Sequence, residues 1–288
     1  MATRSGETTL KLSARCARLI GMTDPVINPG ILASTRLPPE RYLELIRSGS
    51  ARLSEVATMT SNGGLDAGVS CCPGWKVRDV LSHVAEVYQH KIACMRDNAN
   101  PDPWPLPEFE GRDPKEFFTA STEELLRELE ERGPAEPSFT WWADDQSTGF
   151  WFRRMAQETA VHRYDAELAH DATTPIDPEL AVDGIDEVLR LMLGGPWWAE
   201  YDTSHPVDAT VRVDFGGRFW LAAVGHDSVT ITDESYDGPD RPEPVAGISG
   251  DPELVLLWLW GRRGDDAVSF DGDPDVLKEF RARLAEAT

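Results

Sequence analysis

The stretch FWFRRMAQETAVHRYDAELAH, residues 150–170, decides the fold of the first half of the chain. It contains no Gly or Pro, and its apolar residues Trp151 and Met155 lead along a stripe of helical spacing into Glu158 and His162. The stretch predicts a helix with an ionisable pair on its core-facing side, because residues four apart share one helix face. Such a pair costs free energy unless it is hydrogen-bonded, ion-paired or metal-bound. Glu158 and His162 are therefore candidates for a functional site.

Three more helices are predicted before this stretch, since apolar residues recur at helical spacing and segments rich in Gly and Pro separate them. These helices span residues from about 39 to 59, 76 to 98 and 114 to 131. Four helices of these lengths and spacings predict a four-helix bundle. Residues 1–36 precede the bundle as an additional arm.

The second half of the chain combines strand and helix patterns. The runs ATVRVDFGGRFWLAAV (209–224) and DSVTITDES (227–235) read as strands joined by turns that contain Gly. Further strands are predicted at 244–250 and 266–272, and helices at 178–193, 250–263 and 273–287, the last capped by Asp273 or Asp275. The sequence therefore predicts an α+β protein, with a helical bundle at 37–175 and a small α+β domain at 176–288.

Composition and charge limit the partners of this chain. Its 288 residues carry 28 Lys plus Arg against 50 Asp plus Glu, a formal charge of -22, so its surface repels phosphate backbones and anionic lipid. The longest apolar run, 254–260, is far shorter than the ~18 to 20 residues of a membrane span. The first residues show no secretory apolar block with a cleavage site. We expect a globular cytoplasmic protein that binds neither nucleic acid nor membrane.

The cysteines do not indicate a metal knuckle or a disulfide framework. Cys71 and Cys72 are adjacent, which is poor geometry for an ordinary disulfide, and Cys16 and Cys94 are isolated. We expect reduced thiols, and the sequence marks none of them as a nucleophile.

Glu158 and His162 would supply two of the three protein ligands that a catalytic zinc site typically uses, with a fourth position left open. His170 lies eight residues beyond His162, roughly 12 Å along the helix axis, too far to share one ion. On the second helix, His83 and His90 are seven residues apart, so only one of them can join the site. We prefer His83, which lies beside the core stripe near the middle of the bundle, and assign His90 to packing or solvent.

Two carboxylates stand three residues after candidate ligands and could orient an imidazole: Asp165 after His162, and Glu86 after His83. From spacing alone, however, Glu158 and His162 are also compatible with a pair on the surface of a helix. The core stripe and the matching His83 make a metal site as well supported as a surface pair.

Two strings resemble the amino-terminal domain of the mycothiol-dependent maleylpyruvate isomerase family, a branch of the DinB-like metal-binding bundles. They are CPGWKVRDVLSHVAEV, residues 72–87, and WFRRMAQETAVHRYDAELA, residues 151–169. The first carries the family pattern W-x-V-x-D-x-x-x-H and the second E-x-x-x-H-R-x-D. The resemblance implies that His83, Glu158 and His162 bind a divalent metal, usually assigned as zinc.

The string GDPELVLLWLWGRRGD, which begins at Gly250, is similar to a string in the small α+β domain of the same family. An arginine of that string is implicated in catalysis in the isomerase, and Arg262 is the matching position. The alternative is an arginine that binds the last carbonyls of its helix. The similarity covers about residues 37–288, whereas residues before Leu37 depart from the usual pattern.

The resemblance implies an enzyme that uses mycothiol as a thiol cosubstrate. A thiolate on the open metal position would attack a small electrophile, as an isomerase or an S-transferase. Arg262 would bind a carboxylate or oxyanion of that substrate. Two alternatives remain: a metal-dependent hydrolase that activates water, and a non-catalytic ligand-binding or regulatory protein on the same fold.

Overall fold

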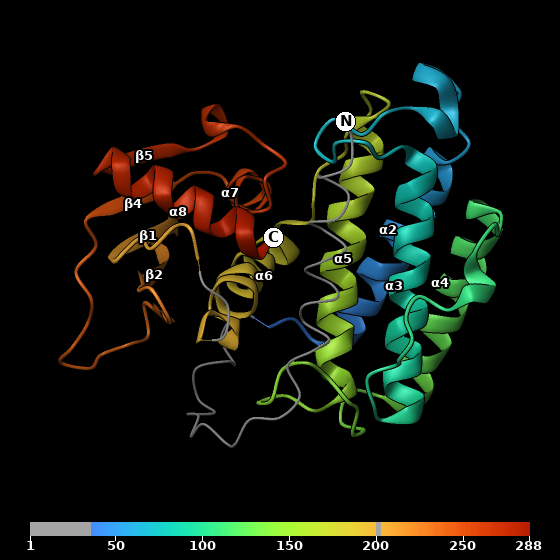
Figure 1. Cartoon of the computed structure of the whole chain (residues 1–288), viewed down its shortest axis with the longest axis horizontal. Coiled ribbons are helices and arrows are strands. Elements are labelled where there is room, and N and C mark those ends of the chain that lie inside the picture. The colour runs from blue at the N-terminus through green and yellow to red at the C-terminus, as the bar shows by residue number, and fades with distance from the viewer. Residues whose placement is uncertain (1–35, 200–202) are drawn as a thin grey trace. The chain divides into compact units, whose positions relative to one another are not determined.

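The computed structural model describes residues 36–199 and 203–288. They form two compact units, residues 36–176 and residues 177–288 (Figure 1). Apart from Arg36, the expected arm at residues 1–36 lies outside the described residues.

The first unit contains four long helices that lie side by side (Figure 1). They are α2 (Pro39–Val56), α3 (Val77–Asp97), α4 (Pro114–Arg132) and α5 (Thr148–Leu168). Helix α5 packs against α2 and α3, and α4 packs against α3 and α2, so each helix has two main neighbours. Short 3-10 turns at Ser61–Asp66 and Pro107–Phe109 lie in the connections. The predicted four-helix bundle is therefore present, with helix bounds within a few residues of those expected.

Helix α5 is buried over more of its surface than the core-facing stripe in its sequence predicts. Between Thr148 and Leu168, every residue is buried except Gly149, Glu158 and Leu168, which are partly exposed. The burial of α5 therefore extends beyond the predicted core-facing stripe to its other faces. Glu158 lies at the one partly exposed position in the middle of the helix, so the candidate site has access to solvent.

Asp-Pro pairs determine where several helices begin. Asp113, Asp177, Asp251 and Asp273 each precede a Pro at the first helical position and accept hydrogen bonds from backbone N–H groups of the first turn. The aspartate satisfies donors that have no partner within the helix, and Pro lacks the N–H that would otherwise be left unpaired. The cap of the last helix is therefore Asp273, one of the two residues predicted.

The second unit contains a five-stranded mixed sheet with strand order β3-β2-β1-β4-β5. The strands are β1 (Ala209–Phe215), β2 (Arg218–Val224), β3 (Val229–Asp233), β4 (Ala246–Ser249) and β5 (Ser269–Gly272). Neighbouring strands are antiparallel except for β1 and β4, which pair in parallel. Gly216 and Gly217 both have positive φ angles and join β1 to β2, as a tight hairpin requires. The α+β expectation is confirmed.

Helices α6 (Pro178–Glu187), α7 (Pro252–Leu259) and α8 (Pro274–Ala287) complete the second unit. The predicted helix 178–193 is α6 followed by a π-helical segment, Val188–Leu193, and a 3-10 turn follows at Pro196–Ala199. Helix α8 packs against β1 and β4, and α7 packs against α6. Another 3-10 turn, Asp265–Ala267, precedes β5.

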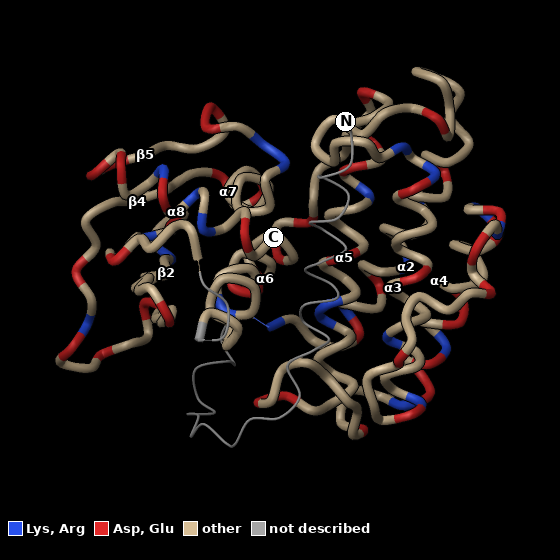
Figure 2. The backbone as a smooth tube through the Cα atoms, in the orientation of Figure 1, with Lys and Arg blue, Asp and Glu red and all other residues tan. Residues whose placement is uncertain are grey.

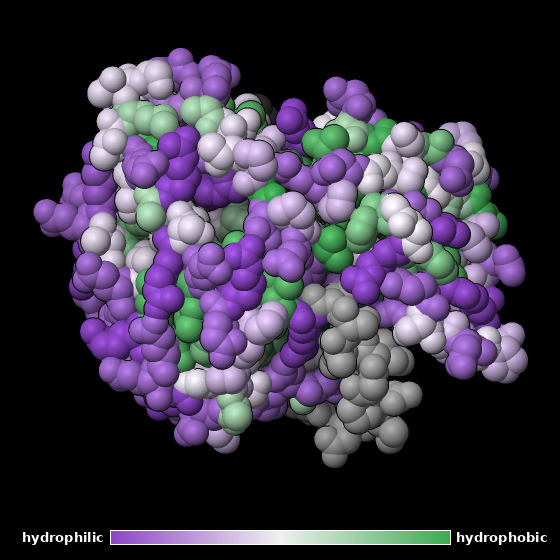
Figure 3. Space-filling model, turned by 180° about the vertical axis from the view of Figure 1, so that it is seen from behind, coloured by the Kyte–Doolittle hydropathy of each residue, from purple (hydrophilic) through white to green (hydrophobic). Residues whose placement is uncertain are grey.

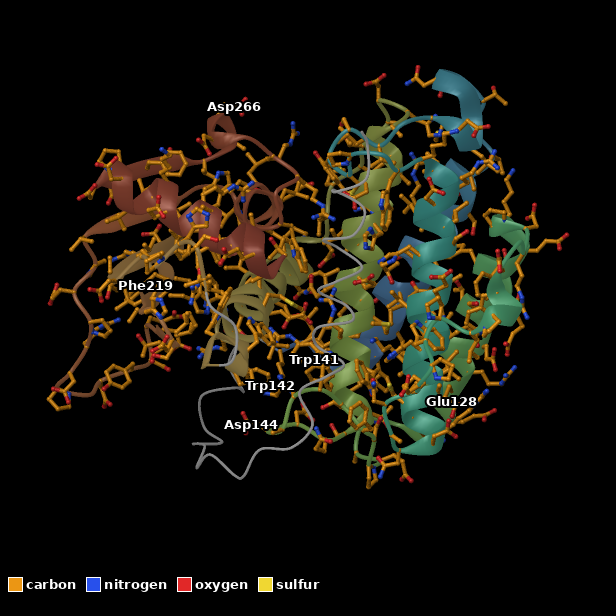
Figure 4. All side chains as sticks on the ribbon, in the orientation of Figure 1. Glu128, Trp141, Trp142, Asp144, Phe219 and Asp266 are labelled. Carbon is orange, nitrogen blue, oxygen red and sulfur yellow. The ribbon has the colours of Figure 1, made fainter. Side chains whose placement is uncertain are left out.

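Acidic residues outnumber basic ones along both units (Figure 2). Many are paired: Glu128 of α4, labelled in Figure 4, accepts hydrogen bonds from Arg96 at 2.8 Å and Arg132 at 2.6 Å. The face in Figure 3 is mainly hydrophilic with scattered apolar residues. Among the described residues, the large apolar side chains that are exposed are Val245 and Phe270. No helix in this part of the chain has the length and apolar character needed to cross a membrane.

Candidate metal centre

Three of the predicted ligands converge between α3 and α5. The Nε2 atom of His83 lies 3.3 Å from Oε1 of Glu158, and the Nε2 atom of His162 lies 3.2 Å from the same oxygen. The two imidazole rings approach edge to face, with centroids 4.8 Å apart. One atom of each residue therefore faces a common point.

The spacing of these atoms fits a divalent cation such as zinc. Nitrogen and oxygen ligands at roughly 2.0 to 2.1 Å from a tetrahedral zinc lie about 3.3 Å from one another. The two N···O distances, 3.3 and 3.2 Å, match that separation, and two imidazoles with one carboxylate are a common catalytic zinc donor set. The residues present are thus suited to hold such an ion and leave a fourth position for another ligand.

Local sequence explains why His83 points to this place. Asp79 accepts a hydrogen bond from the backbone N–H of Lys76 at 2.8 Å and closes the first turn of α3. His83 follows Asp79 by four residues, so it lies one turn further along the same face. Trp75, just before the helix, packs edge-on to His83 and stacks on His162, with centroid distances of 5.0 and 6.3 Å. Trp75 therefore forms an apolar wall on the centre.

Two further residues orient the proposed ligands through hydrogen bonds to atoms that do not face the common point. Arg154 donates from Nη2 to Oε2 of Glu158 at 2.7 Å, which leaves Oε1 directed at the two imidazoles. Oδ2 of Asp165 lies 3.0 Å from Nδ1 of His162, so this carboxylate favours the tautomer that keeps Nε2 available for a metal. The orienting role predicted for Asp165 has the required geometry. In the described part of the chain no hydrogen bond joins Glu86 to His83, so the structure gives no support to an orienting role for Glu86.

Burial and mutual contacts shift the pKa values of His162, Glu158 and His83. Burial by itself lowers the pKa of His162, but the charge of Glu158 and hydrogen bonds with Asp165 and Glu158 outweigh it and raise that pKa to about 10. Burial by itself raises the pKa of Glu158, yet His162, His83 and Arg154 together hold it well below its ordinary value. The pKa of His83 is lowered, mainly by burial. A cation that binds here must therefore displace a proton from His162, whereas His83 is already neutral.

The other candidate residues lie elsewhere. His90 contacts Cys94 and Lys91 through Nδ1 and packs edge-on to Trp104, so it is a packing residue as predicted. His170 shares a 2.9 Å hydrogen bond between its Nδ1 and Oγ of Ser61.

Arg262 belongs to the second unit, where its Nη1 donates to the carbonyl oxygen of Trp260 at 2.6 Å. That contact agrees with the helix-end alternative for this arginine.

Sequence reasoning did not identify Arg154 or the two adjacent cysteines near the centre. Arg154 precedes Glu158 by four residues, a spacing that indicates an ion pair on a helix. Cys71 and Cys72 direct their sulfur atoms at the carboxylate of Asp165. A hydrogen bond with Cys72, burial and the nearby Asp165 all raise the pKa of Cys71, so it stays protonated. No local pattern signals this contact, because the residues are more than 90 positions apart.

Two sequence profiles from known proteins match this chain. The profile of the mycothiol maleylpyruvate isomerase N-terminal domain matches residues 45–167 and includes the three converging residues. The profile of the MDMPI C-terminal domain matches residues 179–279. No curated protein sequence matches the chain.

Two solved structures have a similar fold. They are the crystal structures of the mycothiol-dependent maleylpyruvate isomerase and of a histidine-to-alanine variant of it. Each has a TM-score of 0.53 and covers 82% of this chain and 95% of the solved chain, with sequence identities of 16% and 15% respectively. At this identity the likeness shows the fold alone.

Proposed function

Because the chain belongs to the mycothiol-dependent maleylpyruvate isomerase family, we propose that it is a metal-dependent enzyme that uses a thiol such as mycothiol. Its substrate is a small electrophile, and its reaction is an isomerisation or an S-transfer. The single observation that carries this proposal is the convergence of His83, Glu158 and His162 on one point with zinc-like spacing.

A divalent cation in this centre would lower the pKa of a coordinated thiol and keep it as a thiolate at neutral pH. Glu158 and the two imidazoles supply three ligand atoms, and Arg154 and Asp165 fix their directions. Trp75 limits the access of water on one side of both imidazoles. These residues therefore provide a preorganised position for the sulfur of a thiol cosubstrate.

The same thiolate supports either outcome, depending on the electrophile. Addition to a cis double bond conjugated with a carbonyl leaves a single bond that rotates, and elimination then returns the thiol and releases the trans isomer. Displacement of a leaving group, or opening of an epoxide, gives a stable thioether. The reaction class is therefore set by the substrate more than by the three ligands.

Arg262 is the residue of the second unit that we propose to bind a carboxylate or oxyanion of the substrate. Its guanidinium also lies 5.8 Å from the centre of the Trp260 ring, where it is partly exposed. A planar guanidinium binds a carboxylate through two parallel hydrogen bonds, and this geometry is specific for such anions.

The test is turnover of maleylpyruvate and of a panel of epoxides and activated halides, with and without mycothiol, by the zinc-loaded protein and a His83→Ala variant. We expect turnover only with the thiol and only with His83 present. Turnover without any thiol would instead identify a metal hydrolase. If the zinc-loaded protein binds mycothiol but converts none of the electrophiles, the non-catalytic alternative is favoured.

A further inference from the structure

Cys71 and Cys72 form a second cluster of possible metal ligands beside the first. They lie in a turn that precedes α3, closed by backbone hydrogen bonds from Cys72 to Val69 at 3.1 Å and from Trp75 to Cys72 at 2.9 Å. Both cysteines are reduced and half-buried. The turn directs the two thiols to the same carboxylate, that of Asp165 on α5, which is completely buried.

The distances in this cluster resemble those around a bound metal. Sγ of Cys71 lies 3.2 Å from Oδ1 of Asp165, and Sγ of Cys72 lies 3.6 Å from Oδ2. Sulfur at roughly 2.3 Å and oxygen at roughly 2.0 to 2.2 Å from a tetrahedral zinc are about 3.6 Å apart. The three ligand atoms all lie within 4.8 Å of one another, so small side-chain movements bring them around one ion.

We propose that Cys71, Cys72 and Asp165 form a second metal site, one that takes a soft divalent cation of the zinc and cadmium class. Two thiolates and one carboxylate favour such ions over magnesium or calcium, which prefer oxygen ligands. On binding, two S–H bonds are replaced by two sulfur–metal bonds and two protons are released to solvent, with no change of oxidation state. The half-buried thiols give the ion a path from solvent.

Asp165 connects this site to the first one. Oδ2 contacts Nδ1 of His162 at 3.0 Å, while Oδ1 faces Cys71. The carboxylate faces Cys71 through Oδ1 and both Cys72 and His162 through Oδ2, so a cation bound by the two thiols and this carboxylate lies next to the group that contacts His162. The second site rests on the positions of its own three ligands and does not depend on the proposed function.

The experiment is a titration of the full-length protein with Cd²⁺, followed by the ultraviolet thiolate-to-cadmium charge-transfer absorption. The starting protein carries Cys16→Ser, so that this cysteine cannot contribute, and Glu158→Gln, which removes one ligand of the first site. We expect one equivalent of Cd²⁺ to produce the absorption. Adding Cys71→Ser or Cys72→Ser should weaken binding by about tenfold or more, whereas Cys94→Ser should leave it unchanged.

Two results would overturn the proposal. One is the absence of charge-transfer absorption in the starting protein, and the other is an absorption that persists in the double variant with both Cys71→Ser and Cys72→Ser. Far-ultraviolet circular dichroism of each variant shows whether the helices are retained. Cys71→Ala provides a second variant if the serine protein does not fold. The charge-transfer absorption reports thiolate ligands only, so it does not depend on enzymatic turnover. The second metal site and the proposed enzymatic function can therefore be refuted independently.

Discussion

Asp165 is the residue on which the geometry of the centre depends most. It is fully buried and lies within 3.0 Å of His162 Nδ1, with both adjacent thiols directed at it. Asp165→Asn should weaken zinc binding at the first site by roughly 10- to 100-fold, because the amide orients the imidazole less firmly. Competition with a chelator measures this affinity. Asp66→Asn, at an exposed carboxylate, is the matched control, and equal affinities in the two variants would contradict the assignment.

His90 gives a pH-dependent prediction that does not involve the metal. Burial, with a smaller effect of the Lys91 charge, lowers its pKa to about 2, below the value near 6.5 expected in the unfolded chain. Below about pH 6.5 the unfolded state therefore binds a proton that the folded state does not, and stability falls as the pH falls.

Urea unfolding at about pH 7.5 and about pH 5 should show that His90→Gln loses about 1 kcal/mol less stability than the parent protein over this range. An equal loss in both proteins would show that His90 is not held neutral.

The three proposed ligands could be predicted because helical periodicity places Glu158 and His162 on one face, and the family motifs add His83 on the second helix. Arg154 obeys the same rule and could have been found. Trp75, Cys71 and Cys72 could not, because their positions depend on how the turn before α3 folds back toward α5. Their contacts arise from tertiary structure that no short pattern encodes.

At the scale of helices, the end of α5 is fixed by a buried carboxylate. Glu167 is fully buried and accepts hydrogen bonds from Arg52 and Arg163 at 2.7 Å each and from the backbone N–H of Thr174 at 2.8 Å. It thereby connects α2, α5 and the segment that follows α5. Arg163, from the family motif, therefore has a structural function in this chain.

Glu167→Gln should lower the free energy of unfolding of the helical unit by about 3 kcal/mol, because it leaves the buried Arg163 guanidinium without its counter-charge. Urea unfolding followed by the helical circular dichroism signal measures this. Glu55→Gln is the control, since Glu55 also accepts from Arg52 but its side chain is 67% exposed, and its loss should cost less than about 0.5 kcal/mol. Similar losses in both variants would contradict the account.

Element positions were largely predictable, whereas their pairing was not. Periodicity and Asp-Pro starts determine the helix bounds locally, and alternation determines the strands. The parallel pairing of β1 with β4, which are separated by two strands in sequence, depends on long-range packing. The burial of the other faces of α5 has the same origin: polar residues such as Gln157 and Asp165 are buried by tertiary partners and not by their own pattern.

At the scale of the whole molecule, the proposal requires that a residue of the second unit affects the reaction without affecting the metal. Arg262→Ala should retain the metal content and the thermal stability of the parent protein. Its KM for a carboxylate-bearing electrophile should rise by about tenfold or more, because the substrate loses a charged hydrogen-bond donor. Partial rescue by Arg262→Lys is expected, and an unchanged KM and kcat would leave Arg262 with its helix-end role alone.

The central claim is that Glu158, between His83 and His162, holds a catalytic metal. Its most direct test measures the metal content and mycothiol-dependent turnover of maleylpyruvate by the parent protein and Glu158→Gln under the same conditions. Glu158→Gln should hold one equivalent less of tightly bound zinc and should lose its thiol-dependent turnover. Equal metal content and equal turnover in the two proteins would contradict the claim.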